Sequence, residues 1–466
     1  MSSLDGRNRF GERETGRARA VRFGAFQVDF QERDLYKRGL RLKLQQKPFQ
    51  LLELLLERAG ELVTRKEITD RLWPGLYLDF ARSLNTAVNA LRQALGDSPR
   101  NPRFVETRQG LGYRFIAPVE PVTIAGQAGP RAEGTKRTSE AHQDYLKGRH
   151  FYNKMTEDAL QRSIGYFESA LAADARCAPA LAGLADAYLL LAYFHAMPVD
   201  KALAHAREHA AAALRIDENL AEAHASLGSA IRFQNWDWPG AEARFVKAIE
   251  LDPDSAASHR CYADHLCAKG LAEQAVTAMR RAVELEPLSL RINASMAWML
   301  YMTRDFEGAL AQSWKALALE KDCAAAQHTL GLAYEQLGEF EEAITELRNA
   351  HSCSGGHPIA VAALGHAYAK CGKEVQARKI LGDLGDISRL RRVSHYWTSL
   401  IHAALGETDA ALTGLARGVK DRDVWMVWLG VEPRFDPLRN DARFSRLIRE
   451  LRLGPGGRVA RVAVQA

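Results

Sequence analysis

Polar side chains that can read the edges of base pairs gather on one face of the segment 83–95. Apolar residues recur there at helical spacing and predict a helix whose inward face is made of Leu84, Val88, Leu91 and Leu95. The opposite face then carries Arg82, Thr86, Asn89, Ala90 and Gln93. Amides can make paired hydrogen bonds with adenine in the major groove, and a small side chain can contact a thymine methyl group.

Other side chains around this helix suit contacts with the sugar–phosphate backbone. Arg82 stands near the helix start, where a guanidinium can serve either a base or a phosphate. Asn85 and Arg92 flank the polar face, and we expect both to contact phosphates.

A second candidate element follows in the sequence. Residues 104–107 and 113–116 predict a β-hairpin around the glycine-containing turn 108–112, and its tight turn could enter a minor groove. Thr107, Arg108 and Arg114 would offer a hydroxyl and two guanidinium groups to phosphates.

The elements that must position these residues can also be read from the sequence. Residues 21–44 predict short strands, and residues 47–58 predict an amphipathic helix with Phe49, Leu52, Leu55 and Leu56 inward. Thr64 followed by Glu67 predicts a capping box at the start of a helix that ends near residue 73.

Three separated runs, "KPFQLLELLLERAGELVTRKEITDRLWP", "RSLNTAVNALRQALGD" and "FVETRQGLGYRF", occur in this order. Together they resemble the winged helix-turn-helix domain of the OmpR/PhoB family. The resemblance covers residues 21–118 and implies binding to double-stranded DNA. It also implies a contact with RNA polymerase through the loop 74–81, where Tyr77 and Phe80 would be the aromatic handles.

The distribution of charge agrees with a polyanion-binding N-terminal part. The chain has 466 residues and a formal net charge of +6, and residues 21–118 contain 17 Lys or Arg against 11 Asp or Glu. The rest of the chain beyond residue 118 is close to neutral. A basic module joined to a near-neutral body indicates a nucleic-acid-binding head on a body with another task.

The body is repetitive. Small residues recur every 34 positions at Ala241, Ala275, Ala309, Ala343, Ala377 and Ala411, and a second series contains Ala263, Ala297, Gly331 and Gly365. This period resembles the tetratricopeptide repeat, in which small residues let two helices approach closely. A helix pair within 425–453 is expected to cap the array.

We therefore expect a mainly α protein, with an N-terminal α+β winged helix-turn-helix domain followed by an all-α tetratricopeptide-repeat solenoid. The expected organisation is a basic disordered tail 1–20, the winged helix 21–118, a linker 119–139, the solenoid 140–453 and a disordered tail 454–466. The same architecture is found in HilA-like cytoplasmic transcriptional regulators, which this sequence resembles.

Motifs for catalysis or metal binding are missing from the sequence. There is no GxxxxGK[ST], GxSxG or HExxH pattern. Two groups of His and Cys, at 259–267 and 351–357, lack zinc-ligand spacing. No enzyme activity, cofactor or metal is expected. Six scattered cysteines, no secretory signal and no apolar run of eighteen residues predict a cytoplasmic protein without membrane contact.

The small-residue register also assigns an inner face to the first helix of each repeat. That face gathers Arg232, Phe233, Arg260, Asp264, Arg291, Trp298, Tyr301, Glu335, Gln336, His366 and Lys370. Since Trp, Tyr and Arg often carry binding energy, we expect a protein or peptide partner to bind at Arg260, Arg291, Trp298 and Tyr301. The hypothesis is a sequence-specific transcriptional regulator whose repeats control its DNA-binding head. The alternative is a protein-complex scaffold with a vestigial winged helix.

Overall fold

The computed structural model describes residues 20–453 except 31–32, 38–39, 43, 45, 73–79, 100, 109 and 123–130, and it leaves out the side chains of 40–41, 80–83 and 131–139. The chain divides into two compact units, Met1–Pro130 and Arg131–Ala466. Each unit is built around its own core.

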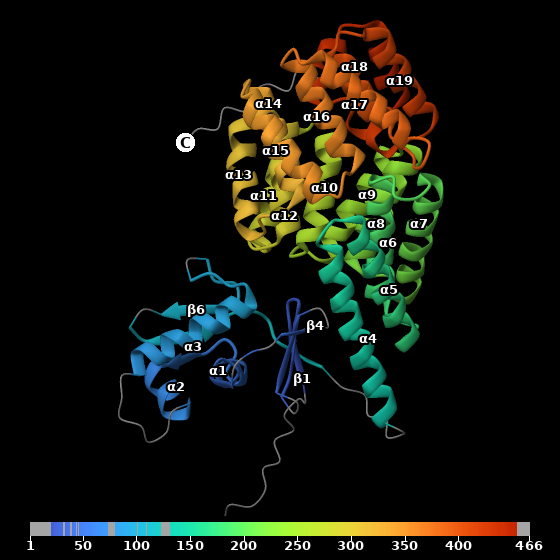
Figure 1. The fold of residues 1–466 in the computed structure, drawn as a ribbon. Coiled ribbons are helices and arrows are strands. Elements are labelled where there is room, and N and C mark those ends of the chain that lie inside the picture. Colours follow the sequence, from blue (N-terminus) through green and yellow to red (C-terminus); the bar gives the residue numbers. More distant parts are fainter. Residues whose placement is uncertain are drawn as a thin grey trace, which may run out of the picture. The chain divides into compact units, whose positions relative to one another are not determined.

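In its described residues, the N-terminal unit combines two small sheets with three helices (Figure 1). In chain order its elements are β1 (Ala20–Phe23), β2 (Phe26–Asp29), β3 (Asp34–Lys37), β4 (Leu40–Leu42), α1 (Gln46–Glu57), β5 (Leu62–Thr64), α2 (Arg65–Leu72), α3 (Phe80–Leu95), β6 (Val105–Arg108), β7 (Gly112–Phe115) and β8 (Glu120–Val122). One sheet has the strand order β4-β3-β2-β1-β8 and the other β5-β7-β6, with antiparallel pairing throughout.

Helices α1 and α3 pack their apolar faces into one core with the strands. Phe49, Leu52 and Leu55 of α1 are buried there, as the spacing predicts. The capping box is confirmed, because the backbone N–H of Glu67 donates to Thr64 Oγ1 (3.2 Å) and that of Thr64 donates to Glu67 Oε2 (2.8 Å). These contacts fix where α2 begins and therefore where α3 can pack.

The stretch expected to be a linker, 119–139, contains regular structure at both ends. Strand β8 pairs with β1, with Val21 opposite Pro121, so it belongs to the N-terminal sheet. Helix α4 begins at Arg131. The expected linker therefore overlaps β8 and α4, and residues 1–19, 123–130 and 454–466 lie outside the described residues.

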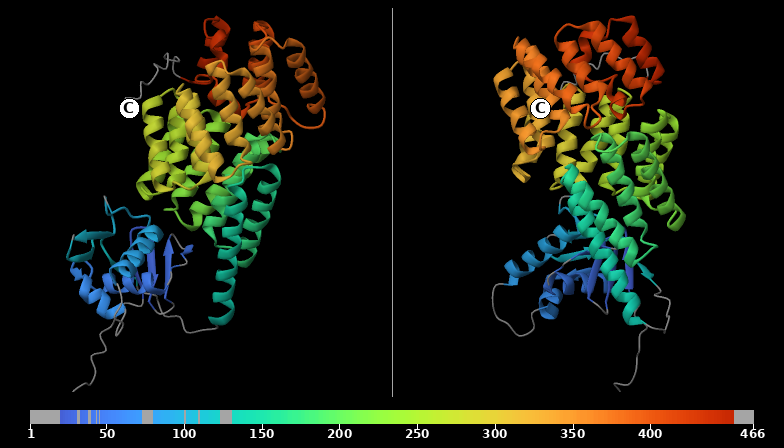
Figure 2. Two further views of the ribbon diagram at one scale, coloured as in Figure 1. Left: turned by 60° about the vertical axis from the view of Figure 1, so that its left-hand side comes forward. Right: turned by 45° about the vertical axis from the view of Figure 1, so that its right-hand side comes forward.

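The C-terminal unit is an array of helical hairpins (Figures 1 and 2). Its helices are α4 (Arg131–Tyr152), α5 (Glu157–Ala173), α6 (Ala178–Tyr193), α7 (Val199–Ile216), α8 (Ala221–Asn235), α9 (Trp238–Leu251), α10 (Ala256–Ala268), α11 (Ala272–Leu285), α12 (Leu290–Met302), α13 (Phe306–Leu319), α14 (Ala324–Leu337), α15 (Phe340–Cys353), α16 (Pro358–Lys370), α17 (Glu374–Ile387), α18 (His395–Ala404), α19 (Thr408–Lys420) and α20 (Ala442–Glu450). Two 3-10 helices, η1 (Val424–Trp428) and η2 (Pro433–Leu438), precede α20.

The 34-residue period is confirmed. The second helix of each hairpin from α9 to α19 begins 34 residues after the previous one. Every alanine of the main series is completely buried. A Cβ added at Gly331 would lie 3.1 Å from the Ala343 carbonyl oxygen and 2.6 Å from Leu347 Cγ, so the glycine is needed where α14 crosses α15. The small residues thus permit close helix packing.

A tight aromatic contact joins the first repeats. Phe167 on α5 is fully buried between Gly148 on α4 and Gly183 on α6. A Cβ at Gly183 would lie 2.5 Å from the ring atom Cζ of Phe167. We expect Gly183→Ala to lower the free energy of unfolding by about 1–3 kcal/mol, because the ring has to move within a dense core.

The matched control for this substitution lies on the neighbouring helix. A Cβ at Gly165 on α5 meets nothing within 4 Å. Gly165→Ala should therefore leave stability unchanged or raise it by up to about 1 kcal/mol. Urea denaturation of the full chain measures both variants, and equal losses in the two would show that the ring contact is not limiting.

The end of the array differs from the expected capping helix pair. Residues 423–438, here called the closing segment, contain η1 and η2 and turn inward against α6, α8 and α18. In all three views, the orange and red C-terminal helices of the body lie beside its green helices (Figures 1 and 2). Only α20 of the expected pair is an α-helix. Among the described residues, no helix combines the length and the hydropathy that crossing a bilayer requires.

Candidate nucleic-acid interface and repeat cavity

Helix α3 presents a polar outer face, as the interface hypothesis requires. Leu84, Val88, Leu91 and Leu95 are buried, together with Ala87. Thr86, Asn89 and Gln93 are exposed on the other side, and Ala90 is half-buried. The side chain of Arg82 lies outside the described residues. The exposed amides of Asn89 and Gln93 sit one helical turn apart, so one groove could receive both.

Asn85 is exposed, but its side chain also makes hydrogen bonds to two other elements of the domain. Its Oδ1 accepts a hydrogen bond from Arg65 Nη2 (2.8 Å) and another from the Tyr113 hydroxyl (3.3 Å). Arg65 also donates to that hydroxyl (3.2 Å). Asn85 therefore connects α2, α3 and β7, and any phosphate contact would use its amide nitrogen.

Arg92 is not a surface residue, which corrects its assignment as a phosphate contact. It is 6% exposed, and its Nη2 donates to the Val105 carbonyl and to Thr107 Oγ1, both at 2.7 Å. The reason is helical geometry: Val88 and Leu95, four residues before and three after, share its stripe and point into the core. Arg92 thus fastens α3 to the β6–β7 hairpin.

The β6–β7 hairpin, here called the wing, carries the remaining predicted residues. Thr107 and Arg108 are exposed and Arg114 is half-buried. Both arginines pair with the carboxylate of Glu106, Arg108 Nε at 3.2 Å and Arg114 Nε at 3.3 Å. Glu106 holds the guanidinium groups in place, and a phosphate would have to compete with it. The loop 74–79, including Tyr77, lies outside the described residues, as does the side chain of Phe80.

Three of the four residues predicted to bind a partner line one cavity in the repeat body. Arg260, Arg291 and Trp298 lie on α10 and α12, and the cavity continues from α6 to α16. Tyr301 does not belong to it, which corrects that prediction. Its ring is completely buried and its hydroxyl donates to Glu432 Oε1 (2.9 Å), because the closing segment covers this part of the inner face.

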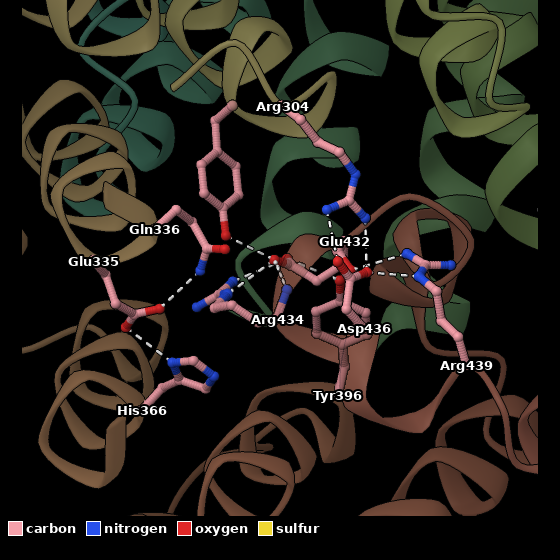
Figure 3. Close-up of polar contacts among 10 residues, drawn as sticks. Arg304, Glu335, Gln336, His366, Tyr396, Glu432, Arg434, Asp436 and Arg439 are labelled. Atoms are coloured by element: carbon pink, nitrogen blue, oxygen red, sulfur yellow. Dashed lines mark hydrogen bonds and ion pairs between the residues drawn. The ribbon is translucent and has the colours of Figure 1, made fainter. Parts of the chain in front are cut away.

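Glu432 of the closing segment is the centre of a buried polar cluster, which lies between this segment and the repeat helices (Figure 3). It accepts hydrogen bonds from Tyr301, from Tyr396 (3.2 Å) and from Nε and Nη2 of Arg434 (both 2.9 Å). Burial alone would raise the pKa of Glu432, but the Arg434 guanidinium and these hydrogen bonds lower the pKa to about 2. Glu432 is therefore ionised at neutral pH.

Two more polar contacts lie on this side of the body, one from the turn after α12 and one from α14. Arg304 makes a bidentate ion pair with Asp436, in which Nη1 donates to Oδ2 and Nη2 to Oδ1, both at 2.7 Å. Glu335, predicted on the inner face, is buried and accepts from Gln336 and His366 (Figure 3). Part of the predicted inner face is thus covered by the protein's own chain.

The closing segment also reaches the beginning of the body. The indole N–H of Trp425 donates to the Tyr193 carbonyl (2.8 Å), and Asp423 Oδ1 lies 3.2 Å from His195 Nε2. From the seventh hairpin, His357 Nε2 lies 3.0 Å from the Phe194 carbonyl. The array therefore closes on itself instead of remaining open.

Several residues of the cavity were missed or passed over. Trp425 and Trp428 line it from the closing segment, and Tyr152 lines it from the end of α4. The paired tryptophans in "WMVW" were a signal, since exposed positions rarely carry two such rings. Arg232 was placed on the inner face but not among the binding residues. Among the described residues, no three His, Cys, Asp or Glu side chains gather as a metal site.

The fold and these contacts define a winged helix joined to a tetratricopeptide-repeat body. Residues 39–115 match the family "Transcriptional regulatory protein, C terminal". This part of the chain is therefore a DNA-binding domain of the OmpR/PhoB type.

Curated relatives match in the same region. A probable transcriptional regulator, ycf27, of Cyanophora paradoxa is 33% identical over 98 residues, which are 20% of this chain and 41% of the relative. Sensory transduction protein RegX3 of Mycolicibacterium smegmatis is 32% identical over 92 residues, which are 20% and 40%. The chain thus spans about 40% of the length of these relatives.

Solved structures resemble each unit separately. The DNA-binding domain of Klebsiella pneumoniae RstA, solved with its RstA box, is 26% identical with a TM-score of 0.20, over 21% of this chain and 96% of that one. MamA is 25% identical with a TM-score of 0.28, over 33% of this chain and 90% of that one. YrrB, described as a repeat protein with an unusual peptide-binding site, is 20% identical with a TM-score of 0.28, over 42% and 96%.

Proposed function

We propose that this protein is a sequence-specific transcriptional regulator that binds duplex DNA through α3 and the wing. The observation that carries the proposal is the exposed row of Thr86, Asn89 and Gln93 on a helix whose other face is buried, in a domain of the matched family. Side chains of this kind in a major groove distinguish base pairs. The proposal includes a cytoplasmic location, where bacterial DNA lies.

The second part of the proposal gives the repeat body a regulatory role. Its inner cavity offers arginine and tryptophan side chains that a solenoid does not need for its own packing. Occupation of the cavity by a partner or ligand would then alter the activity of the DNA-binding head. A contact with RNA polymerase through the loop 74–81 remains part of the proposal, on the family resemblance alone.

DNA binding is tested by comparing two substitutions. We expect Asn89→Ala to reduce discrimination at one base position, costing about 1–3 kcal/mol on the preferred site and little on random DNA. Arg108→Ala should weaken binding to all sequences and reduce the slope of log K against log salt by about one unit. Quantitative gel shifts of the full chain at several salt concentrations measure both quantities.

The control is Asn349→Ala, an exposed asparagine on α15 in the repeat body. It should change neither affinity nor salt slope. If Asn89→Ala and Arg108→Ala affected specific and random DNA alike, α3 would not be the reading helix. Absence of salt-dependent DNA binding in the unmodified chain would favour the scaffold alternative.

A further inference from the structure

The cavity on the inner side of the repeat body has a volume of about 240 Å³. Its walls are mostly aromatic and aliphatic, with Tyr193, Phe194 and Trp298 on the helices and Trp425 and Trp428 on the closing segment. Pockets for small organic ligands typically measure roughly 300–1,000 Å³ and combine apolar walls with a few polar groups. This cavity is close to the lower end of that range.

The carboxylates that line the cavity are all paired with basic groups. Asp186 accepts from Arg149 Nη1 (3.2 Å), and Asp264 accepts from Arg260 Nη1 (3.0 Å). The third, Glu157, pairs with Arg391 and His357. The negative charge of the lining is therefore already balanced.

Two further guanidinium groups line the same cavity, and within the described residues neither forms an ion pair, although the charges of Asp264 and Asp186 act on them from a distance. Arg232 is 3% exposed, and its Nε and Nη1 have no hydrogen-bond partner among the described residues. Arg291 is 9% exposed, and the same holds for its Nη1. Burial lowers the pKa of both side chains. A buried donor without an acceptor destabilises the folded protein. A ligand that brings hydrogen-bond acceptors to these two arginines would remove that cost, so we expect it to bind there.

The stacking of these arginines occupies the faces of their guanidinium groups and not their N–H edges. The Arg291 guanidinium lies over the Tyr152 ring at 4.4 Å, and Arg232 lies over Phe233 at 4.8 Å. Stacking uses the face of the guanidinium, whereas carboxylates and phosphates bind its edge. On α12, two turns after Arg291, the indole N–H of Trp298 is also buried and finds no acceptor in the part of the chain that the structure describes.

We propose that this cavity is a binding site for a small organic anion, a carboxylate or phosphate ester with a planar apolar body. Arg232 and Arg291 bind the anionic group, Trp298 donates one further hydrogen bond, and the tryptophans of the closing segment pack against the body. The proposal rests on the regulatory half of the proposed function and names the ligand class for it.

The shape of the site favours a small molecule over an extended peptide. An open solenoid groove offers a long concave surface, but here the closing segment covers the inner face at Tyr301 and lines the cavity with Trp425 and Trp428. What remains is a partly open cavity of about 240 Å³, lined from the end of α4 to α16 and by the closing segment, and this volume suits a small molecule better than a chain of several residues.

The experiment uses phenyl phosphate as the probe and the full chain as the receptor. Isothermal titration calorimetry should show saturable binding at one site, and tryptophan fluorescence should change with the same dissociation constant. Inorganic phosphate and phenol each lack one half of the probe. Both should bind with an affinity at least about tenfold lower than that of phenyl phosphate. An acidic peptide should not bind.

Arg291→Met and Arg232→Met should weaken binding of phenyl phosphate about tenfold or more. Each should also leave the melting temperature of the ligand-free chain unchanged or raise it, because the substitution removes a buried charge without a partner. A purely structural arginine would lower that temperature instead. Arg378→Met, which removes an exposed arginine on α17, is the matched control and should not affect binding.

Three outcomes would overturn the proposal: no saturable binding at millimolar phenyl phosphate, binding unaffected by both variants, or tight binding of an acidic peptide instead. The DNA-binding function is decided independently by the Asn89→Ala comparison. Binding of phenyl phosphate that leaves DNA affinity unchanged would uphold the site and refute its regulatory role.

Discussion

Replacing Arg434 by methionine should lower the free energy of unfolding of the repeat body by about 3–5 kcal/mol. The substitution leaves the completely buried Glu432 with two tyrosine hydroxyls and the backbone N–H of residue 434 as partners, and without a counter-charge. A buried carboxylate that loses its counter-charge becomes uncompensated or takes up a proton. Urea denaturation of the full chain, followed by tryptophan fluorescence, measures the loss.

The same substitution at an exposed ion pair is the control. Arg378 pairs with Glu374 and Glu407 at the surface, and Arg378→Met should cost no more than about 1 kcal/mol. The double variant Glu432→Gln with Arg434→Met should recover part of the stability, because neither charge then remains. Similar small losses at Arg434 and Arg378 would show that the buried cluster is not important for stability.

This cluster also predicts a pH dependence. The pKa of Glu432 is about 2 in the folded protein and about 4.3 in an unfolded chain. Its stabilisation is therefore fully present above about pH 4.3 and is lost as the pH falls through about 2. In Arg434→Met, this acid-sensitive part of the stability should disappear.

Arg92→Met should destabilise the winged helix by about 1.5–3 kcal/mol, the second large effect we expect. The substitution removes two hydrogen bonds from a charged donor and leaves the Val105 carbonyl without this partner. DNA binding should weaken through loss of folded domain and wing position, while the salt slope of the folded fraction stays the same, because no phosphate contact is removed.

Arg108→Met provides the contrast within the same wing. It should leave stability nearly unchanged and reduce the salt slope by about one unit. Thermal unfolding and salt-dependent gel shifts on both variants separate the two roles. A reduced slope in Arg92→Met at unchanged stability would restore the original assignment of Arg92 to phosphate.

Local periodicity was enough to predict most of the fold. The 34-residue series of alanines identified the repeat helices, and the spacing of Leu84, Val88 and Leu91 identified the buried face of α3. Even the error at Arg92 could have been avoided, since its neighbours at helical spacing are Val88 and Leu95. Such features depend on residues that are close in sequence, and a single sequence contains them.

The covered inner face could not be predicted in this way. Tyr301 meets Glu432, and Tyr193 meets Trp425, across more than a hundred residues. These contacts depend on the accumulated curvature of many hairpins, which no local pattern reports. After Ala411 the repeat ends, so no periodic pattern indicated where the next residues would pack. The two tryptophans of "WMVW" indicated burial, but not the helices that bury them. The assignment of Tyr301 to an open groove failed for this reason.

The inward position of the closing segment has a consequence for biosynthesis. Translation proceeds at about 5–20 residues per second, and residues 423–438 are made only after all the hairpins from α4 to α19. Each hairpin can pack on its predecessor as it emerges, and His357 can contact Phe194 once the seventh hairpin is made, but the residues of the closing segment do not yet exist. The contacts of Asp423, Trp425 and Glu432 with earlier hairpins can therefore form only after these residues have left the ribosome, when the preceding hairpins are already in place.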